Sequence, residues 1–242
     1  MKLSIIVPAF NEEALIEFCL QSIDAALAAN TEFGFMAEII VVDNNSTDRT
    51  AELAAGRGAR VCFEPVNQIG RARNAGAAAA EGQWLMFVDA DSLLSPSLVA
   101  DVFRLIESGT KIGCGSTVRM DGLPRWARTT LWSWNVISVL FRWAAGSLFV
   151  CRADAFRDVG RFSEALYVAE EIDLSRRLKK WGRNRGLKFV ILNAHPLHTS
   201  SRKFKLYTGR EIARQFFWLC VRPFKTIQDR KSLSMWYDGR RE

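Results

Sequence analysis

The stretch "WLMFVDADSLL", residues 84–94, joins a hydrophobic run to two carboxylates. Residues 84–88 have the continuous apolar character of a strand that is buried on both faces. Asp89 and Asp91 follow directly, and two like charges at this spacing repel each other unless a cation holds them. The stretch therefore predicts a buried strand that ends at a charged site.

Strand and helix signals alternate around this stretch through the first 110 residues. Apolar, β-branched runs predict strands at 3–10, 38–43, 59–65 and 83–89. Apolar residues at helical spacing predict helices at 11–29, 46–58, 70–82 and 95–108. Pro8 is expected to end the first strand, and Ser95 to cap the fourth helix. Such alternation is typical of an α/β fold with a doubly wound, mostly parallel, Rossmann-like sheet flanked by helices.

Acidic residues recur where the predicted strands end. Asp43, Glu64, Asp89 and Asp91 follow the second, third and fourth strands, and Glu12 lies in the loop after the first. In such sheets ligands bind at the carboxyl ends of the strands. Carboxylate oxygens suit Mg²⁺ or Mn²⁺, which complete their coordination with water and substrate phosphates. The alternative is that these are ordinary polar loop residues.

The composition of the whole chain limits the class of partner and the compartment. A net charge of +7 favours an anionic partner: nucleotide phosphates, an anionic membrane surface or nucleic acid. Five scattered cysteines without a CxxC pair indicate free thiols in a reducing compartment, hence the cytoplasm. No apolar window is long enough for a membrane-spanning helix. Residues 129–151 come nearest, and they predict either a core helix and strand or a segment on a membrane surface.

Five ordered motifs carry a resemblance to a known family. They are "SIIVPAFNEE", "VVDNNSTDRT", "GRARNAG", "FVDADS" and "AEEIDLSRRLKKWG". Their order and spacing, over about residues 3 to 182, resemble a family 2 glycosyltransferase with the GT-A fold. Small bacterial members with a "TSSRKF" segment and a Trp-Tyr pair, here Trp236 and Tyr237, look most similar.

This resemblance implies a division of the chain. It implies a catalytic domain over 1–200, with a nucleotide-binding half, 1–110, and an acceptor half, 111–200. Residues 201–242 would form a basic, amphipathic C-terminal extension on the acceptor side. The implied partners are a nucleoside diphosphate sugar, linked to UDP or GDP, and an unknown acceptor: a glycan, a lipid carrier or a small molecule. Contact with the cytoplasmic face of a membrane stays open.

The resemblance also implies donor-binding roles. Pro8, Asn11 and Glu12 would border the nucleotide, and Asp43 would accept a hydrogen bond from the base. Arg71 would lie over ribose or phosphate, with Asn74 beside it. Asp89 would contact the ribose and Asp91 would bind the metal, Mn²⁺ or Mg²⁺. Arg71 and Arg73 also lie at a predicted helix N-terminus, which favours anions, although both could be solvated surface charges.

Catalysis by inversion needs a base that takes the proton of the acceptor hydroxyl. The family places an acidic pair at a helix start, and here the pair is Glu170 and Glu171, with Glu171 expected to be the base. The family more often has Asp at the second position. The alternative is that both are surface acids that complement the helix dipole.

Two histidines and three tryptophans complete the set of candidates. The resemblance makes His198 a third metal ligand, with His195 as the second choice. Arg202 and Lys203 could form a basic loop over the diphosphate. The tryptophans of 131–143 predict a buried helix, an acceptor platform or a membrane-contacting surface.

Other classes of protein fit less well. A nucleotide-sugar-binding protein without transfer activity is the main alternative, and the Glu-Glu pair is its one hint. A nicotinamide-dependent oxidoreductase would need GxGxxG after the first strand, where "VPAFNEE" stands. A nucleic-acid-binding module is disfavoured because the basic residues are not gathered in a known binding motif.

Overall fold

The structure is a computed structural model of the whole chain. It describes residues 1–144, 147–202, 206–207, 211, 214, 223–230 and 233. Most of the expected C-terminal extension, 201–242, therefore lies outside the described residues, as do Lys203, Cys220 and the Trp236-Tyr237 pair.

Within the described residues the strands form one eight-stranded sheet in the order β3-β2-β1-β4-β7-β6-β8-β5. The strands are β1 (Lys2–Ala9), β2 (Met36–Asp43), β3 (Arg60–Phe63), β4 (Trp84–Val88), β5 (Ser92–Leu93), β6 (Lys111–Arg119), β7 (Leu148–Arg152) and β8 (Lys188–Thr199). The helices are α1 (Ile16–Ala28), the short η1 (Thr31–Phe33), α2 (Thr50–Gly56), α3 (Ile69–Ala79), α4 (Pro96–Glu107), α5 (Arg125–Phe141), α6 (Ala153–Asp158), α7 (Glu170–Arg183) and α10 (Pro223–Gln228).

The first half of the sheet is parallel, as the alternation of strands and helices predicts. β3, β2, β1 and β4 pair in parallel, and β6 pairs in parallel with β8. β7 is inserted antiparallel between β4 and β6, and β5 pairs antiparallel with β8. The prediction of a mostly parallel, doubly wound sheet is therefore confirmed, while these two reversals were not predicted.

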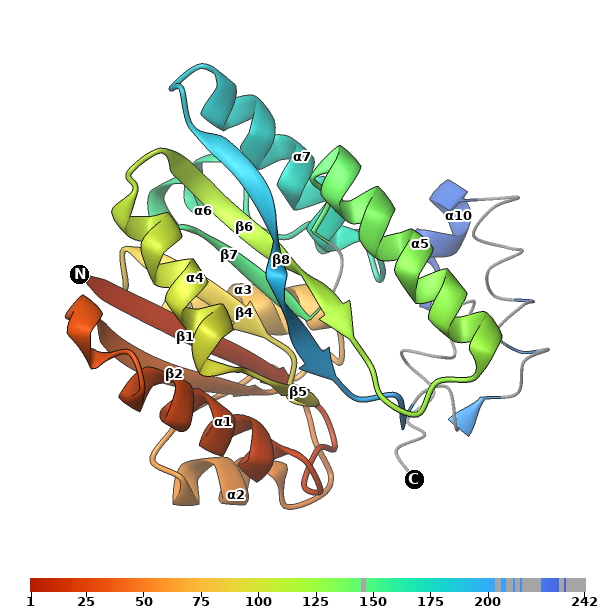
Figure 1. Cartoon of the computed structure of the whole chain (residues 1–242). Helices are drawn as coiled ribbons and strands as arrows, with labels where there is room; N and C mark the ends of the chain where they lie inside the picture. The colour runs from red at the N-terminus through yellow and green to blue at the C-terminus, as the bar shows by residue number, and fades with distance from the viewer. Residues whose placement is uncertain are drawn as a thin grey trace.

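Helices cover both faces of the sheet (Figure 1). Leu3, Ile5 and Val7 of β1 pack into the cluster that contains α1 and α4, whereas Ile6 packs into the cluster that contains α3, α6 and α7. Successive side chains of a strand point to opposite faces, so a strand covered on both sides must be apolar throughout. This is the physical reason for the continuous hydrophobic runs of the sequence.

Two element boundaries differ from the sequence expectations near the carboxyl ends of the strands. Pro8 does not end β1: it lies inside the strand opposite Val42, and β1 continues to Ala9. α1 begins at Ile16, five residues later than expected, because Asn11 has a left-handed backbone with φ 51° and a turn follows it. These differences leave a longer loop between β1 and α1 than the sequence predicts.

Helix α3 lies very close to the sheet. A Cβ atom on Gly76 would clash with Ile6 and would lie 2.9 Å from Cγ2 of Val42. A residue without a side chain is therefore required for this approach. The close packing fixes α3, and with it the arginines of its first turns, against β1 and β2.

Three further expectations have an outcome in the fold. Cys19, Cys114 and Cys151 are buried free thiols, as expected. Among the described residues no helix is long and apolar enough to cross a membrane. The tryptophan-rich segment does not form a buried helix, because Ala127 and Ser138 are the buried residues of α5, while Trp126, Trp132 and Leu140 are exposed.

Candidate active site

The acidic residues after β1, β2 and β4 gather at one edge of the sheet. Ala9, the last residue of β1, is paired with Asp43, the last residue of β2, and β4 lies on the other side of β1. Parallel strands of matched register end at the same edge, so the loops that carry Glu12, Asp43 and Asp89 meet there. The expected functional edge is therefore formed by residues of three separate loops.

The loops after β1 and β2 are fastened to each other. The side-chain Oδ1 of Asn11 accepts the backbone N–H of Thr47 at 2.8 Å, and its own N–H donates to Ser46 Oγ at 3.0 Å. Asp43 Oδ1 accepts the N–H of Ser46 at 2.9 Å. Pro8 is buried just before these loops. These contacts give the carboxylate of Asp43 a fixed position at the edge.

Glu12 is buried and tied to the C-terminal part of the chain. Nη2 of Arg202 donates to both carboxylate oxygens of Glu12, at 2.6 and 2.8 Å. Such charge-assisted pairs are among the stronger hydrogen bonds in proteins. The contact joins the segment after β8 to the loop that follows β1, whereas closure of Arg202 and Lys203 over a diphosphate stays a prediction.

Arg73 forms the centre of the site. Its side chain is 2% exposed, so the alternative that it is a solvated surface charge is wrong. Nη2 lies 2.9 Å from Asp89 Oδ1, and Nη1 lies 2.9 Å from Glu170 Oε1 and 2.8 Å from Glu171 Oε1. One guanidinium therefore joins the first acid after β4 to the acid pair at the start of α7.

The charges of this cluster do not balance if every carboxylate is ionised. Burial alone would lower the pKa of Arg73, but Glu171, Asp89 and Glu170 outweigh it and raise that pKa, so the guanidinium stays charged. Burial, followed by the charge of Glu171, raises the pKa of Glu170 to about 8. A proton on Glu170 leaves two carboxylates beside one guanidinium, which reduces the repulsion.

The two glutamates consequently differ although they are adjacent. The side chain of Glu170 is 3% exposed and that of Glu171 is 13% exposed, so the alternative of two surface acids is wrong. A protonated, enclosed Glu170 is poorly placed to accept a proton. Glu171 has the access to solvent that a general base needs to reach an acceptor hydroxyl.

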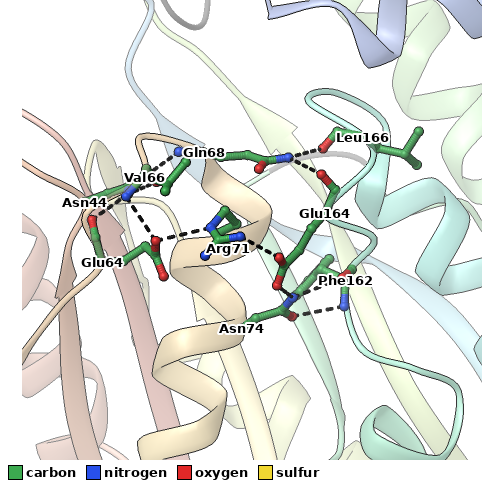
Figure 2. Close-up of polar contacts among 9 residues, drawn as sticks. All are labelled: Asn44, Glu64, Val66, Gln68, Arg71, Asn74, Phe162, Glu164 and Leu166. Carbon is green, nitrogen blue, oxygen red and sulfur yellow. Dashed lines mark hydrogen bonds and ion pairs between the residues drawn. The ribbon is translucent and has the colours of Figure 1, made fainter.

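Arg71 belongs to a second, more exposed network (Figure 2). Its Nε lies 3.2 Å from Glu64 Oε1 and its Nη1 lies 2.8 Å from Glu164 Oε2. Asn44 and Gln68 continue the network: Gln68 donates its backbone N–H to Asn44 and its side-chain amide to the backbone oxygens of Glu164 and Leu166. The network fastens the segment before α7 to the edge of the sheet.

Asn74 has a structural position in this network. Its side-chain amide donates to the backbone oxygen of Phe162 at 3.0 Å, and its Oδ1 accepts the Phe162 N–H at 3.1 Å. It is buried, and it also contacts Glu164. Asn74 thus holds the segment that leads into α7, while Arg71 beside it is the more accessible of the two.

Asp91 faces a different environment from Asp89. β4 ends at Val88, and the N–H of Ser92 donates to the backbone oxygen of Asp89, which closes a turn. The extended geometry of β4 therefore does not persist to Asp91. Asp91 Oδ1 instead accepts a hydrogen bond from Thr199 Oγ1 at 3.3 Å.

Asp91 and His198 line one pocket of about 570 Å³. The other lining residues belong to α1 or to the chain around β5 and β8: Leu15, Phe18, Gln21, Ser22, Ala25, Ala90, Leu93 and Ser200. His198 Nε2 lies 3.0 Å from Asp121 Oδ2. His195 contacts Asp101 of α4 instead, at 2.7 Å from Oδ2.

The residues around Asp91 fit a metal that is shared with a substrate. Among the described residues no group of three or more His, Cys, Asp or Glu side chains could hold an ion by itself. Mg²⁺ and Mn²⁺ are commonly held by one or two carboxylates together with substrate phosphates and water. The carboxylate of Asp91 is of the kind that such a shared ion needs, and the imidazole of His198 lines the same pocket, with its Nε2 paired to Asp121.

Comparison with known proteins decides the family. The model of Glycosyl transferase family 2 matches residues 4–156. The chain belongs to this family. An uncharacterized glycosyltransferase of Mycobacterium tuberculosis is 36% identical over 141 residues, which cover 55% of this chain and 58% of the relative. A dolichol-phosphate mannosyltransferase of Pyrococcus furiosus is 32% identical over 124 residues, 48% of this chain and 33% of the relative.

Solved structures support the GT-A fold of this family member. A mannosyltransferase from Pyrobaculum calidifontis, in complex with GDP-Man and Mn²⁺, superimposes with a TM-score of 0.68 at 18% identity, covering 98% of this chain and 67% of the other. Glucosyl-3-phosphoglycerate synthase from Mycobacterium tuberculosis, with Mn²⁺ and UDP-glucose, gives 0.61 at 19% identity, covering 95% and 80%. At these identities the likeness shows the fold alone, and the chain spans about three fifths of the length of the mycobacterial sequence relative.

Sequence reasoning did not predict the contacts of three residues that the structure brings into the site. Arg73 was expected either to favour an anion or to be a solvated charge, Glu64 was expected only as one of the acids at the strand ends, and Glu164 was given no role. Two arginines within "GRARNAG" lie 200° apart around the helix, so one of them had to face the sheet or the segment beside it. That periodicity was the available signal for a buried arginine.

Proposed function

We propose that this chain is an inverting, metal-assisted glycosyltransferase that moves a sugar from a nucleoside diphosphate sugar to an acceptor hydroxyl. The observation that carries the proposal is the contact of Arg73 with Asp89 on one side and with Glu170 and Glu171 on the other. It couples a residue expected at the donor to the residues expected at the acceptor. Membership of the family supports the same activity.

The donor is assigned to the edge formed by residues 1–110. Asp43, the expected acceptor of a hydrogen bond from the base, is held by the N–H of Ser46, and Asp89, the expected ribose contact, is held by Arg73. Arg71 and the loop of Asn11 and Glu12 border this edge and suit the diphosphate and nucleoside. UDP and GDP both fit this chemistry, and structural neighbours bind UDP-glucose and GDP-Man.

The acceptor is assigned to the half formed by residues 111–200. In the transfer, the acceptor oxygen attacks the anomeric carbon while the bond from that carbon to the phosphate oxygen breaks. Glu171 takes the hydroxyl proton, and the nucleoside diphosphate leaves with the electron pair of the broken bond. Arg73 holds Glu171 in position, and the protonated Glu170 spares the cluster a third negative charge.

Asp91, with His198, would hold Mn²⁺ or Mg²⁺ together with the donor diphosphate. Bound there, the ion would neutralise negative charge on the leaving diphosphate. The hydroxyl of Thr199 donates to the carboxylate of Asp91 and orients it in the absence of the ion. The Glu12–Arg202 pair ties the segment after β8 to the loop after β1 at the same edge.

Substitution of Asp91 tests the metal assignment. Asp91→Ala should weaken binding of UDP or GDP in the presence of Mn²⁺ by about a hundredfold or more, because the ion loses its protein carboxylate. Isothermal titration with and without Mn²⁺ measures this effect. Asp101→Ala, which removes a carboxylate on α4, is the matched control; unchanged Mn²⁺-dependent affinity in Asp91→Ala would refute the assignment.

Substitution of Glu171 tests the catalytic assignment. In a screen of UDP- and GDP-sugars for transfer and hydrolysis, Glu171→Gln should bind the donor normally and lower kcat by about 10²–10⁴-fold, because the variant lacks a base. Normal turnover of the variant would refute the role of Glu171. Donor binding by the wild type without turnover on any acceptor or water would favour the binding-protein alternative.

A further inference from the structure

The outer side of α5 is apolar and exposed. Its exposed hydrophobic side chains are Trp126, Trp132, Val136, Ile137, Val139, Leu140 and Phe141. Trp132 is 66% exposed and Leu140 is 72% exposed. A surface helix of a globular protein normally turns its apolar side to the core; α5 packs Ala127 and Leu131 inward, yet most of its large apolar side chains lie on the outer side. Exposed apolar area of this extent is typical of a surface that binds another protein or a membrane.

A row of cations lies beside this helix on α7. Arg176, Lys179, Lys180 and Arg183 are spaced so that they share one side of α7. None of the four forms an ion pair with another residue in the described part of the chain, whereas Arg177 on the neighbouring side pairs with Asp173. The pKa of Lys179 is lowered by burial and by the charges of Arg142 and Arg176, which indicates positive charge that no nearby acid neutralises.

The apolar side of α5 meets the cations of α7 at the C-terminal end of α5, and the two together are here called the α5–α7 face. Nζ of Lys179 donates to the backbone oxygen of Phe141 at 2.8 Å, and the rings of Phe141 and Trp143 stack at 4.9 Å. The four α7 cations and Trp143 line a hollow of about 440 Å³. A second hollow of about 270 Å³ is lined by Arg142, Lys179, Arg183 and Lys188, among other residues.

We propose that the α5–α7 face docks onto an anionic phospholipid membrane. The cations complement lipid phosphates, and the tryptophans and aliphatic side chains of α5 suit the boundary between headgroups and acyl chains. α5 contains Arg125 and Arg128 and no acidic residue, so nothing on the helix repels an anionic surface. The combination favours a membrane over nucleic acid, which would not need the apolar side, and over a neutral protein surface, which would not need the cations.

The face adjoins the candidate active site through α7. The same helix carries Glu170 and Glu171 in its first turn, and Arg176 follows about 9 Å further along the axis at 1.5 Å per residue. Docking would therefore bring the start of α7 close to the lipid surface. The inference does not rest on the proposed transferase activity, because docking is measured without donor or acceptor.

Co-sedimentation with vesicles tests the inference on the full chain. Vesicles of phosphatidylcholine with phosphatidylglycerol should bind the wild type at least tenfold more tightly than vesicles of phosphatidylcholine alone, and binding should weaken as salt screens the charges. One variant replaces the cations: Arg176→Gln, Lys179→Gln, Lys180→Gln and Arg183→Gln. A second variant, Trp132→Ser with Leu140→Ser, removes apolar contact. Each should lower binding at least tenfold.

Matched controls separate the face from general charge and hydrophobicity. The charge control removes the same number of cations from the two ends of α2, from β3 and from α4. Its substitutions are Arg49→Gln, Arg57→Gln, Arg60→Gln and Arg104→Gln. The apolar control, Met36→Ser, changes a residue that is 65% exposed on β2. Both controls should bind vesicles like the wild type, and circular dichroism checks that every variant is folded.

Three results would overturn the inference. One is a wild type that does not bind the anionic vesicles, and another is equal loss of binding in the test and control variants. The third is a dimer in solution, measured by light scattering, that Trp132→Ser with Leu140→Ser dissociates while vesicles are not bound. In that case α5 would pair with a second copy of the chain.

Discussion

Arg71 and Arg73 lie two residues apart on α3, yet they belong to two different kinds of ionic network. The side chain of Arg73 is 2% exposed and contacts three carboxylates, whereas that of Arg71 is 35% exposed and contacts two. Residues at this spacing point to nearly opposite sides of a helix. Arg73 therefore faces β4 and α7, and Arg71 faces the edge of the sheet and the segment before α7.

Exposure, more than the number of partners, determines the role of each of these two arginines. Around Arg71 water screens the charges, so its guanidinium can exchange Glu64 or Glu164 for a substrate phosphate at little cost. Around Arg73 no water replaces a lost partner, so the contacts are obligatory. We infer that Arg71 binds ligand and that Arg73 holds the catalytic residues in place.

The largest effect is expected from Arg73→Ala. The carboxylates of Asp89 and Glu171 and the protonated Glu170 would be left without their cation, and the free energy of unfolding should fall by about 3–5 kcal/mol. Urea denaturation at neutral pH measures this loss. Arg71→Ala is the matched control on the same helix, and its free energy of unfolding should fall far less. If Arg73→Ala lowers the free energy of unfolding by less than about 1 kcal/mol, the range of exposed ion pairs, then the contacts of Arg73 do not differ in strength from those of Arg71.

A smaller effect, dependent on pH, is expected from Glu170→Gln. Burial beside Glu171 raises the pKa of Glu170 from 4.5 to about 8. Between these values the folded chain binds more protons than the unfolded chain, so the contribution of Glu170 to stability decreases as pH rises through this window. Gln cannot ionise, so the variant should lose less stability than the wild type between about pH 5 and about pH 8.

Urea denaturation at the two pH values measures this difference, which should amount to a few kcal/mol. Glu107→Gln, at the exposed end of α4, is the control and should follow the wild type. Equal pH dependence in Glu170→Gln and the wild type would mean that Glu170 is not the protonated member of the cluster.

The smallest effect on stability is expected from Arg71→Ala, which should act on the donor instead. If the side chain contacts phosphate or ribose, its loss should raise the KM for the donor about tenfold, the equivalent of one charge-assisted hydrogen bond. Steady-state kinetics with the donor found in the screen measures this change. Arg104→Ala, which removes a cation paired with Asp101, should leave the KM unaltered. An unchanged KM in Arg71→Ala would remove Arg71 from the donor site.

Most of the sheet could be predicted from the sequence because buried strands must be apolar on both faces. The runs that became β1, β2, β3 and β4 were expected to within a few residues. The antiparallel direction of β7 could not be predicted, since "LFVC" has the same apolar character in either direction. The degree of burial of α5 could not be predicted either, because its composition resembles a core helix while most of its large apolar residues face outward.

For the site, the sequence by itself determined that acidic side chains follow buried strands at one edge of a sheet. That much depends on local patterns, which fix where a strand ends and at which edge parallel strands meet. The tertiary structure alone decided which acids meet one cation: Arg73 contacts Asp89, 16 residues away, and Glu170 and Glu171, 97 and 98 residues away. Such contacts depend on the order of the strands and the packing of α3 and α7, and no local pattern of the chain encodes these.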